Sequence, residues 1–206
     1  MLKDQEIDAV IIALPNHLHL KCVVDAAEAK KHIFLEKPIA RSTEEAKHIL
    51  SVTQKNNVKL MMGYPLRFNQ QFRNLKTKIL DGTLGDIEIA NANYISTGPF
   101  FHGAKAHTPI PVPEWWFNKE LTGGGALIDL GSHLINLLRW YFGEVKDVKS
   151  HLGYRFNMSF EDRATCLAKF ENNAKAIITV GWFSQDYHLN IQLYGTVKQS
   201  KPNTNP

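Results

Sequence analysis

Residues 8–14 read DAVIIAL, a continuous apolar run in which three residues are β-branched. A run without a polar residue at every second position predicts a strand buried on both faces, as in a parallel sheet covered by helices. A helix is predicted next, over residues 17–30, where His19, Val23, Ala26 and Ala27 recur at helical spacing. The polar Asn16 is a plausible N-cap for it.

Two more strands follow at similar spacing. HIFLE at 32–36 and VKLMMG at 58–63 have strand character, and a helix between them opens at Ser42 or Thr43 with Glu45 in its first turn. Alternation of strand, helix, strand, helix and strand is typical of parallel βαβ units. We therefore predict a parallel α/β part over residues 1–63.

The pattern changes beyond residue 63. A Pro- and aromatic-rich segment at 98–117 predicts a long irregular connection, which is often functional. Helices are expected at 126–142 and, earlier, along an apolar side formed by Phe68, Phe72, Leu75 and Ile79. Alternating apolar and polar residues predict strands at 86–97, 145–156, 162–171, 174–183 and 187–194. Residues 64–206 are thus expected to form an α+β domain with a mostly antiparallel sheet.

The composition excludes several classes of partner. The 206 residues are 44% apolar and 21% charged, with a formal net charge of +4 and no basic stripe, so we expect no nucleic-acid partner. No apolar run approaches the roughly 18 residues of a membrane span, and no signal-peptide pattern opens the chain. We expect no membrane partner and a cytoplasmic location, with Cys22 and Cys166 free.

Two polar groups follow predicted parallel strands, namely Pro15-Asn16-His17 and Glu36-Lys37-Pro38. Ligands of open parallel sheets bind outside the carboxyl ends of the strands, so both groups are expected on one rim of a cleft. Pro38 disfavours helical geometry at Lys37, which would hold the lysine extended toward the cleft. Glu36 could keep the lysine charged, orient it or contact a cofactor. The alternative is a solvated loop lysine.

A second candidate group lies in GGGALIDLGSH at 123–133. The glycines would allow a ligand to approach the backbone closely, and Asp129 and His133 are four residues apart on one helical face. A histidine oriented by an aspartate suits a proton carrier, although an ordinary surface pair is the alternative. His17 and His19 diverge around a helix start without a third ligand, so no metal site is expected.

Together these motifs resemble the glucose-fructose oxidoreductase / inositol dehydrogenase / MocA family of NAD(P)-dependent oxidoreductases. The resemblance runs through PNHLH (15–19), EKP (36–38), GYPLRF (63–68), GGGALIDLGSH (123–133) and LYGT (193–196). It implies that residues 1–63 belong to a dinucleotide-binding Rossmann domain and residues 64–206 to a substrate and oligomerisation domain. It further implies NAD or NADP as cofactor, with hydride transfer at a hydroxyl-bearing carbon of a sugar, inositol or related polyol.

The resemblance also implies roles for individual residues. Lys37 matches a lysine that contacts the substrate hydroxyl and the nicotinamide, and Asp129 and His133 match the substrate-side pair, with His133 as proton acceptor. The positions that match cofactor contacts are Pro15, Asn16, Glu36, Pro38 and Arg67. This scheme is chemically coherent, because a base removes the hydroxyl proton while a cation stabilises the developing negative charge.

The chain departs from the family pattern at both ends. The family opens with a strand, a G-x-G-x-x-G turn and a helix, whereas only seven residues precede DAVIIAL. We expect a truncated member with weak cofactor binding, because the turn that binds the pyrophosphate is missing. An unpaired sheet edge also predicts a homo-oligomer, a dimer or tetramer that buries this edge or the antiparallel sheet face against a second copy.

Two other classes of function stay open. One is a catalytically silent remnant that acts as an assembly or interaction module. The other is a lyase or aldolase that uses Lys37 as a Schiff-base nucleophile, which needs a desolvated lysine of lowered pKa.

Overall fold

The computed structural model describes residues 1–99, 112–197, 199–200 and 203–204, the last four by their backbone. The chain divides into two compact units, of which the first comprises residues 1–64 and 114–124 and the second residues 65–113 and 125–206. The sequence prediction put a single boundary after residue 63, and the structure adds that the chain returns to the first unit over 114–124. Most of the segment predicted to be irregular, residues 100–111, lies outside the described residues.

The first unit is built on a parallel sheet of three strands, in the order β1-β2-β3. These strands are β1 (Ala9–Ile12), β2 (His32–Glu36) and β3 (Leu60–Gly63). Val10 lies opposite Ile33, and Leu35 lies opposite Met62. The other elements of the unit are η1 (Asn16–Leu18), α1 (His19–Glu28), α2 (Thr43–Lys55), η3 (Glu114–Phe117) and α4 (Lys119–Thr122). The predicted βαβ arrangement is confirmed.

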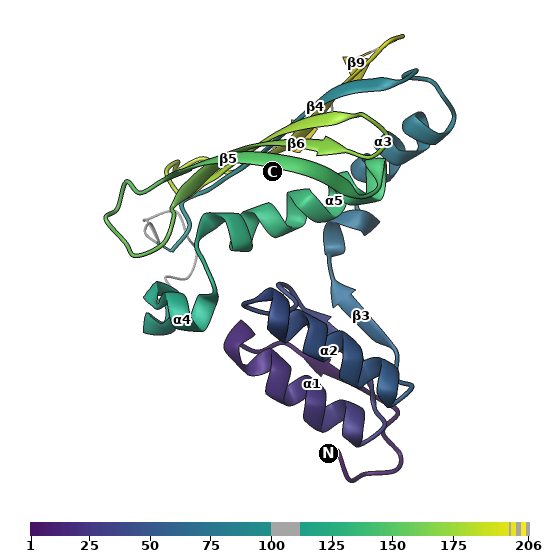
Figure 1. Cartoon of the computed structure of the whole chain (residues 1–206), viewed down its shortest axis with the longest axis vertical. Helices are drawn as coiled ribbons and strands as arrows, with labels where there is room; N and C mark the ends of the chain where they lie inside the picture. Colours follow the sequence, from purple (N-terminus) through teal and green to yellow (C-terminus); the bar gives the residue numbers. More distant parts are fainter. Residues whose placement is uncertain (100–111, 198, 201–202, 205–206) are drawn as a thin grey trace. The chain divides into compact units, whose positions relative to one another are not determined.

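The core of this unit lies on one face of its sheet. Val10 and Leu35 share a buried cluster with Val23 of α1 and Ile49 of α2, so both helices cover the same face (Figure 1). Ile11, on the opposite face of β1, is 76% exposed. The prediction that DAVIIAL is buried on both faces is therefore wrong within the described residues. An all-apolar strand cannot reveal from its sequence which of its two faces is covered.

The second unit contains a sheet of seven strands, in the order β10-β8-β4-β7-β6-β5, with β9 also paired to β8. All neighbours are antiparallel except β4 and β7, which confirms the mostly antiparallel sheet. The strands are β4 (Ile87–Ile95), β5 (Val145–Gly153), β6 (Arg163–Phe170), β7 (Lys175–Gly181), β8 (His188–Gly195), β9 (Gln199–Ser200) and β10 (Asn203–Thr204). The helical elements are η2 (Pro65–Phe68), α3 (Gln70–Leu80), the π-helical turn η4 (Leu127–Gly131) and α5 (Ser132–Phe142).

Helix α5 lies along one face of this sheet and supplies much of the core (Figure 1). Its Leu134, Leu137 and Leu138 are fully buried, as are the alternate residues of β6 and β7 that face it. The hydroxyl of Tyr141 donates to the carbonyl of Phe72 at 2.9 Å, which ties α5 to α3. On the opposite sheet face, Leu167 is 48% exposed. One face of the sheet is thus covered and the other is open.

Two helix predictions need correction. Phe68 was assigned to the apolar side of a helix, but it lies in the short turn η2 and is 65% exposed, while α3 buries Phe72 and Leu75. The helix predicted over 126–142 is interrupted at its start by the π turn η4. None of the helices in the described part of the chain has the length and apolarity needed to cross a membrane.

Candidate functional site

The candidate site residues fall into two groups, one in each unit. In the first unit, the carboxyl end of β2 carries Glu36, Lys37 and Pro38, with a cis peptide bond between Lys37 and Pro38. The backbone N–H of Lys37 donates to Oε2 of Glu36 at 3.2 Å. The Glu36 carboxylate also lies against Gly63 of β3, where an added Cβ would be 3.1 Å from Oε1. Glu36 therefore extends over the end of the neighbouring strand.

His19 connects the two loops at the strand ends. Its side chain has no exposed surface, and its ring nitrogens lie 2.9 Å from the Pro38 carbonyl (Nδ1) and 2.9 Å from the Leu14 carbonyl (Nε2). The sequence placed His19 on the apolar face of the helix, which correctly indicates burial. A buried imidazole needs polar partners, and those partners hold the loop after β1 and the loop after β2 together.

Asn16 has a different role from the predicted N-cap. No side chain caps α1, whose N-cap residue is Leu18. Asn16 is buried, and its side-chain nitrogen donates to the carbonyl of Thr122. This bond fastens the returning segment 114–124 to the loop after β1. A buried amide without a hydrogen-bond partner would make folding less favourable, so the bond favours this position of the segment.

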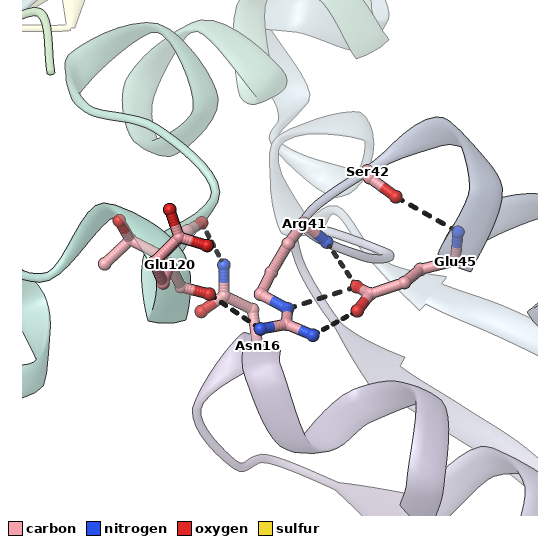
Figure 2. A network of polar contacts seen from close by, with 6 residues as sticks. Asn16, Arg41, Ser42, Glu45 and Glu120 are labelled. Atoms are coloured by element: carbon pink, nitrogen blue, oxygen red, sulfur yellow. Dashed lines mark hydrogen bonds and ion pairs between the residues drawn. The ribbon is translucent and has the colours of Figure 1, made fainter.

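Figure 2 shows the second attachment of this segment, centred on Arg41. Arg41 donates through its backbone N–H (3.1 Å) and Nε (3.2 Å) to Oε2 of Glu45, and through a terminal nitrogen to Oε1. Its other terminal nitrogen donates to the carbonyl of Glu120 at 2.6 Å. The hydrogen bond from Arg41 is the largest cause that lowers the pKa of Glu45. A single guanidinium thus connects the start of α2 to α4.

The glycines at 123 and 125 lie against the backbone of their own units, in the segment where a ligand was expected to approach. Gly123 has a left-handed φ of +81°, and an added Cβ would lie 2.7 Å from the backbone of Arg41. A Cβ at Gly125 would lie 1.7 Å from the carbonyl oxygen of Glu161. Each glycine lets its own unit close on itself at that point.

In the second unit, His133 of α5 lies at Tyr94 of β4, and Asp129 lies four residues before His133 in the π turn. The ring of His133 packs against the ring of Tyr94 with centroids 5.9 Å apart. The pKa of Tyr94 is raised mainly by burial, then by its hydrogen bond with Tyr187, and also by the negative charge of Asp129. Tyr187 donates its hydroxyl proton to the Tyr94 hydroxyl at 3.1 Å. Two acid–base groups and two phenols therefore share one region of the second unit.

Arg67 is anchored close to this region. Its Nε donates to the side-chain oxygen of Asn136 at 2.7 Å, and its guanidinium carbon lies 5.7 Å from the ring centroid of Trp140. Both partners are on α5, which also carries His133. Arg67 thus orders the segment after β3 against the helix that carries the candidate base.

Comparison with known proteins identifies the family. Residues 1–64 match a family model described as an oxidoreductase family with an NAD-binding Rossmann fold, and residues 72–199 match the GFO/IDH/MocA C-terminal domain. The chain belongs to the GFO/IDH/MocA family. The resemblance inferred from the motifs is confirmed, as is the fold class.

Relatives within the GFO/IDH/MocA family include several dehydrogenases. An uncharacterized oxidoreductase, YrbE of Bacillus subtilis, is 30% identical over 203 residues, which are 95% of this chain and 55% of that protein. Levoglucosan dehydrogenase of Pseudarthrobacter phenanthrenivorans is 34% identical over 152 residues, which are 74% of this chain and 37% of that protein. A structure of levoglucosan dehydrogenase with NADH and levoglucosan has a TM-score of 0.88 at 27% identity, covering 98% of this chain and 56% of that one. The chain therefore spans little more than half the length of these relatives.

Two residues of this GFO/IDH/MocA member were missed by the sequence reasoning, namely Tyr94 and Glu161. Tyr94 lies in β4 and contacts His133 of α5, which is far from it in the sequence. Glu161 binds residues more than thirty positions earlier in the chain. Neither contact has a local sequence signal. In the described residues, no cluster of three or more His, Cys, Asp or Glu side chains is placed to hold a metal ion.

The Arg41–Glu45 pair gives a testable pH dependence. Glu45 has a lowered pKa in the folded state, so its contribution to stability is present above the unfolded-state pKa and is lost as the pH falls through the folded-state pKa. We expect Glu45→Gln to lower the free energy of unfolding by about 1 kcal/mol at neutral pH and to have little effect near pH 3. Urea unfolding followed by circular dichroism at both pH values measures the difference.

Glu44→Gln provides the matched control, because Glu44 is exposed in the same first turn of α2 and shares only the helix-dipole effect. A loss of stability equal for both variants, or one that persists at acidic pH, would show that the ion pair with Arg41 does not stabilise the unit.

Proposed function

We propose that this chain is part of an NAD(P)-dependent dehydrogenase that oxidises a hydroxyl-bearing carbon of a sugar, inositol or related polyol. Family membership supports the oxidoreductase class, and levoglucosan dehydrogenase and an NADP-dependent scyllo-inositol 2-dehydrogenase are among the relatives. The observation that carries the proposal is the joint position of Asp129 and His133 at Tyr94. An aspartate and a histidine near a half-buried phenol provide a base and an apolar wall, which suit a hydroxylated ring.

The first unit offers the groups that would hold the cofactor. Its parallel strands end in a polar rim, and Nδ1 of His17 there is buried without a hydrogen-bond partner among the described residues. A buried nitrogen in this condition fits a polar ligand group, because an unsatisfied polar atom costs free energy. Pro15, Asn16, Glu36 and Pro38 would contact the cofactor, with Arg67 supporting the nicotinamide side. Asn16 uses its nitrogen on Thr122, so its amide oxygen would make the contact.

The chain's own residues would handle the proton and the charge. A bound nicotinamide supplies the hydride acceptor. As the C–H bond breaks, His133 would take the hydroxyl proton on an imidazole nitrogen, and the Lys37 ammonium would stabilise the negative charge that develops on the oxygen. Asp129 would orient the imidazole and stabilise its protonated form.

We also propose a cytoplasmic homo-oligomer. Cys22 and Cys166 are free thiols, as expected in a reducing compartment. The open sheet face of the second unit exposes Leu167 and Ile177, which are cross-strand partners and are 48% and 38% exposed. Two apolar side chains that adjoin on an open face favour burial against a second copy. The same face would serve the alternative function, a catalytically silent assembly module.

The dehydrogenase proposal predicts polyol-dependent formation of NAD(P)H, followed by absorbance in a screen of sugars and inositols. Residues 1–206 and a form extended by the upstream coding sequence are assayed side by side, because residues 1–206 contain no G-x-G-x-x-G turn to bind a pyrophosphate. In the active form, Lys37→Met and His133→Gln are each expected to lower kcat by about 100-fold or more, since each removes a group that acts on the reacting hydroxyl.

Lys59→Met and His48→Gln are the matched controls, because both residues are exposed in the first unit. Full turnover by the Lys37 or His133 variant would contradict the assigned roles. Absence of turnover in every form would favour the assembly module, and borohydride trapping of a sugar aldehyde on Lys37 would favour the lyase.

The assembly proposal predicts a dimer or tetramer at micromolar concentration in sedimentation. We expect the double variant Leu167→Glu/Ile177→Glu to shift the chain toward monomer with an unchanged circular dichroism spectrum, because four buried charges in a dimer interface are strongly unfavourable. Ile11→Glu, on the open face of the first unit, is the comparison variant. If only Ile11→Glu dissociates the oligomer, the interface lies on the parallel sheet, and a monomeric parent chain would contradict the assembly altogether.

A further inference from the structure

The helix that carries Asp129 and His133 begins in an unusual way. The residues just before it are glycines 123–125, which have no side chain to cap the free N–H groups at a helix start. Those N–H groups bond instead to one residue of a distant segment, Glu161. Its Oε1 accepts from the backbone N–H of Gly125 and of Leu127, both at 3.0 Å, and its backbone carbonyl accepts from Ala126 at 3.0 Å. Three successive N–H donors are thus held by one glutamate.

This contact is tight and buried. Glu161 is 9% exposed, and its carbonyl oxygen is so close to Gly125 that no other residue type fits there without displacement. A carboxylate at a helix start is also favoured by the helix dipole. The end of the helix is therefore fixed in position, and not merely capped.

The fixed end is followed at once by the π turn Leu127–Gly131, which contains Asp129. A π turn holds one residue more than an α-helical turn of the same span. The N–H of Asp129 donates to the Gly125 carbonyl at 3.1 Å, and the Asp129 carbonyl accepts from the Ser132 hydroxyl at 3.1 Å. The surplus residue is thus enclosed between the glutamate-bound start and α5.

We infer that Glu161 is a positioning residue that keeps the π turn in place and thereby keeps Asp129 on the side of His133 and Tyr94. If its bonds to residues 125 and 127 are removed, the start of the helix is free to shift by one residue. The extra residue then moves out of the turn, and the π turn becomes α-helix. Such a conversion rotates the residues before α5 by roughly 100°. Asp129 would then turn away from Tyr94, while His133 in α5 would lose its acidic neighbour.

This inference rests on the proposed function, in which Asp129 and His133 handle the substrate proton, but its test needs no turnover. The full chain is labelled with isotopic histidine, and His133→Gln identifies the His133 ring signal among the nine histidines. The chemical shift of that signal depends on the Tyr94 ring and on the charge of Asp129, so it reports the geometry directly. Amide hydrogen exchange of residues 127–131 is measured in parallel.

We expect Glu161→Ala to shift the His133 signal and to accelerate exchange over residues 127–131 by about tenfold or more, since two charge-assisted bonds are lost. Glu161→Gln should leave both measurements near those of the parent, because an amide oxygen can still accept both N–H groups. Glu161→Asp withdraws the acceptor by one methylene and should give an intermediate shift, which keeps the test available if the alanine variant does not fold. Glu171→Ala, an exposed glutamate at the other end of β6, is the matched control.

Two results would overturn the inference. One is a Glu161→Ala protein of lower melting temperature with an unchanged His133 signal and unchanged exchange, which would make the residue merely stabilising. The other is a Glu161→Gln protein that behaves as Glu161→Ala. If Glu161→Ala shifts the His133 signal but no form of the chain oxidises a polyol, the proposed function is wrong and the positioning role stands. If the chain oxidises a polyol but Glu161→Ala leaves the signal unshifted, the proposed function stands and the positioning role is wrong.

Discussion

Parallel pairing of β1, β2 and β3 is the constraint on which the first half of the candidate site depends. Because the three strands run in the same direction, Leu14 and Glu36 emerge at the same edge of the sheet. A single imidazole, that of His19, then lies between the two emerging loops, with one ring nitrogen 2.9 Å from a carbonyl oxygen of each loop. The backbone position of Lys37 follows from the strand pairing and from the contacts of His19, because neither of them involves the side chain of residue 37.

The second half of the site depends on a helix whose start is held from outside. The glycines before residue 126 remove the side chains that would normally cap the helix, and the vacated space is filled by the backbone of Glu161. A helix that began with a serine cap would satisfy its own N–H groups and would not need a distant partner. Here the capping residue, Glu161, lies two residues before β6, so the orientation of the helix is coupled to the sheet that it covers.

Sequence reasoning succeeded where the deciding contacts are local. The family motifs, the strands β1 to β8 and the approximate positions of the longer helices were predicted correctly, because hydrophobic periodicity and turn residues are set within short windows. It failed at DAVIIAL, where an apolar residue at every position hides which face is covered, and at Asn16, whose partner Thr122 lies far along the chain. The π turn was missed for a related reason, since its five residues have ordinary helical periodicity and only the contact with Glu161 favours the extra residue.

The buried polar residues that support both groups share one property, which is that they bind backbone. His19 binds the carbonyls of Leu14 and Pro38, Asn16 binds the carbonyl of Thr122, and Glu161 binds the N–H groups of Gly125 and Leu127. Backbone groups are present whatever side chain a position carries, so these bonds fix the path of the chain and not the identity of the exposed residues. These bonds therefore do not depend on which side chains stand at positions 37, 129 and 133. A change at His19, Asn16 or Glu161 would therefore act first on the path of the backbone, and through it on the groups that the backbone presents.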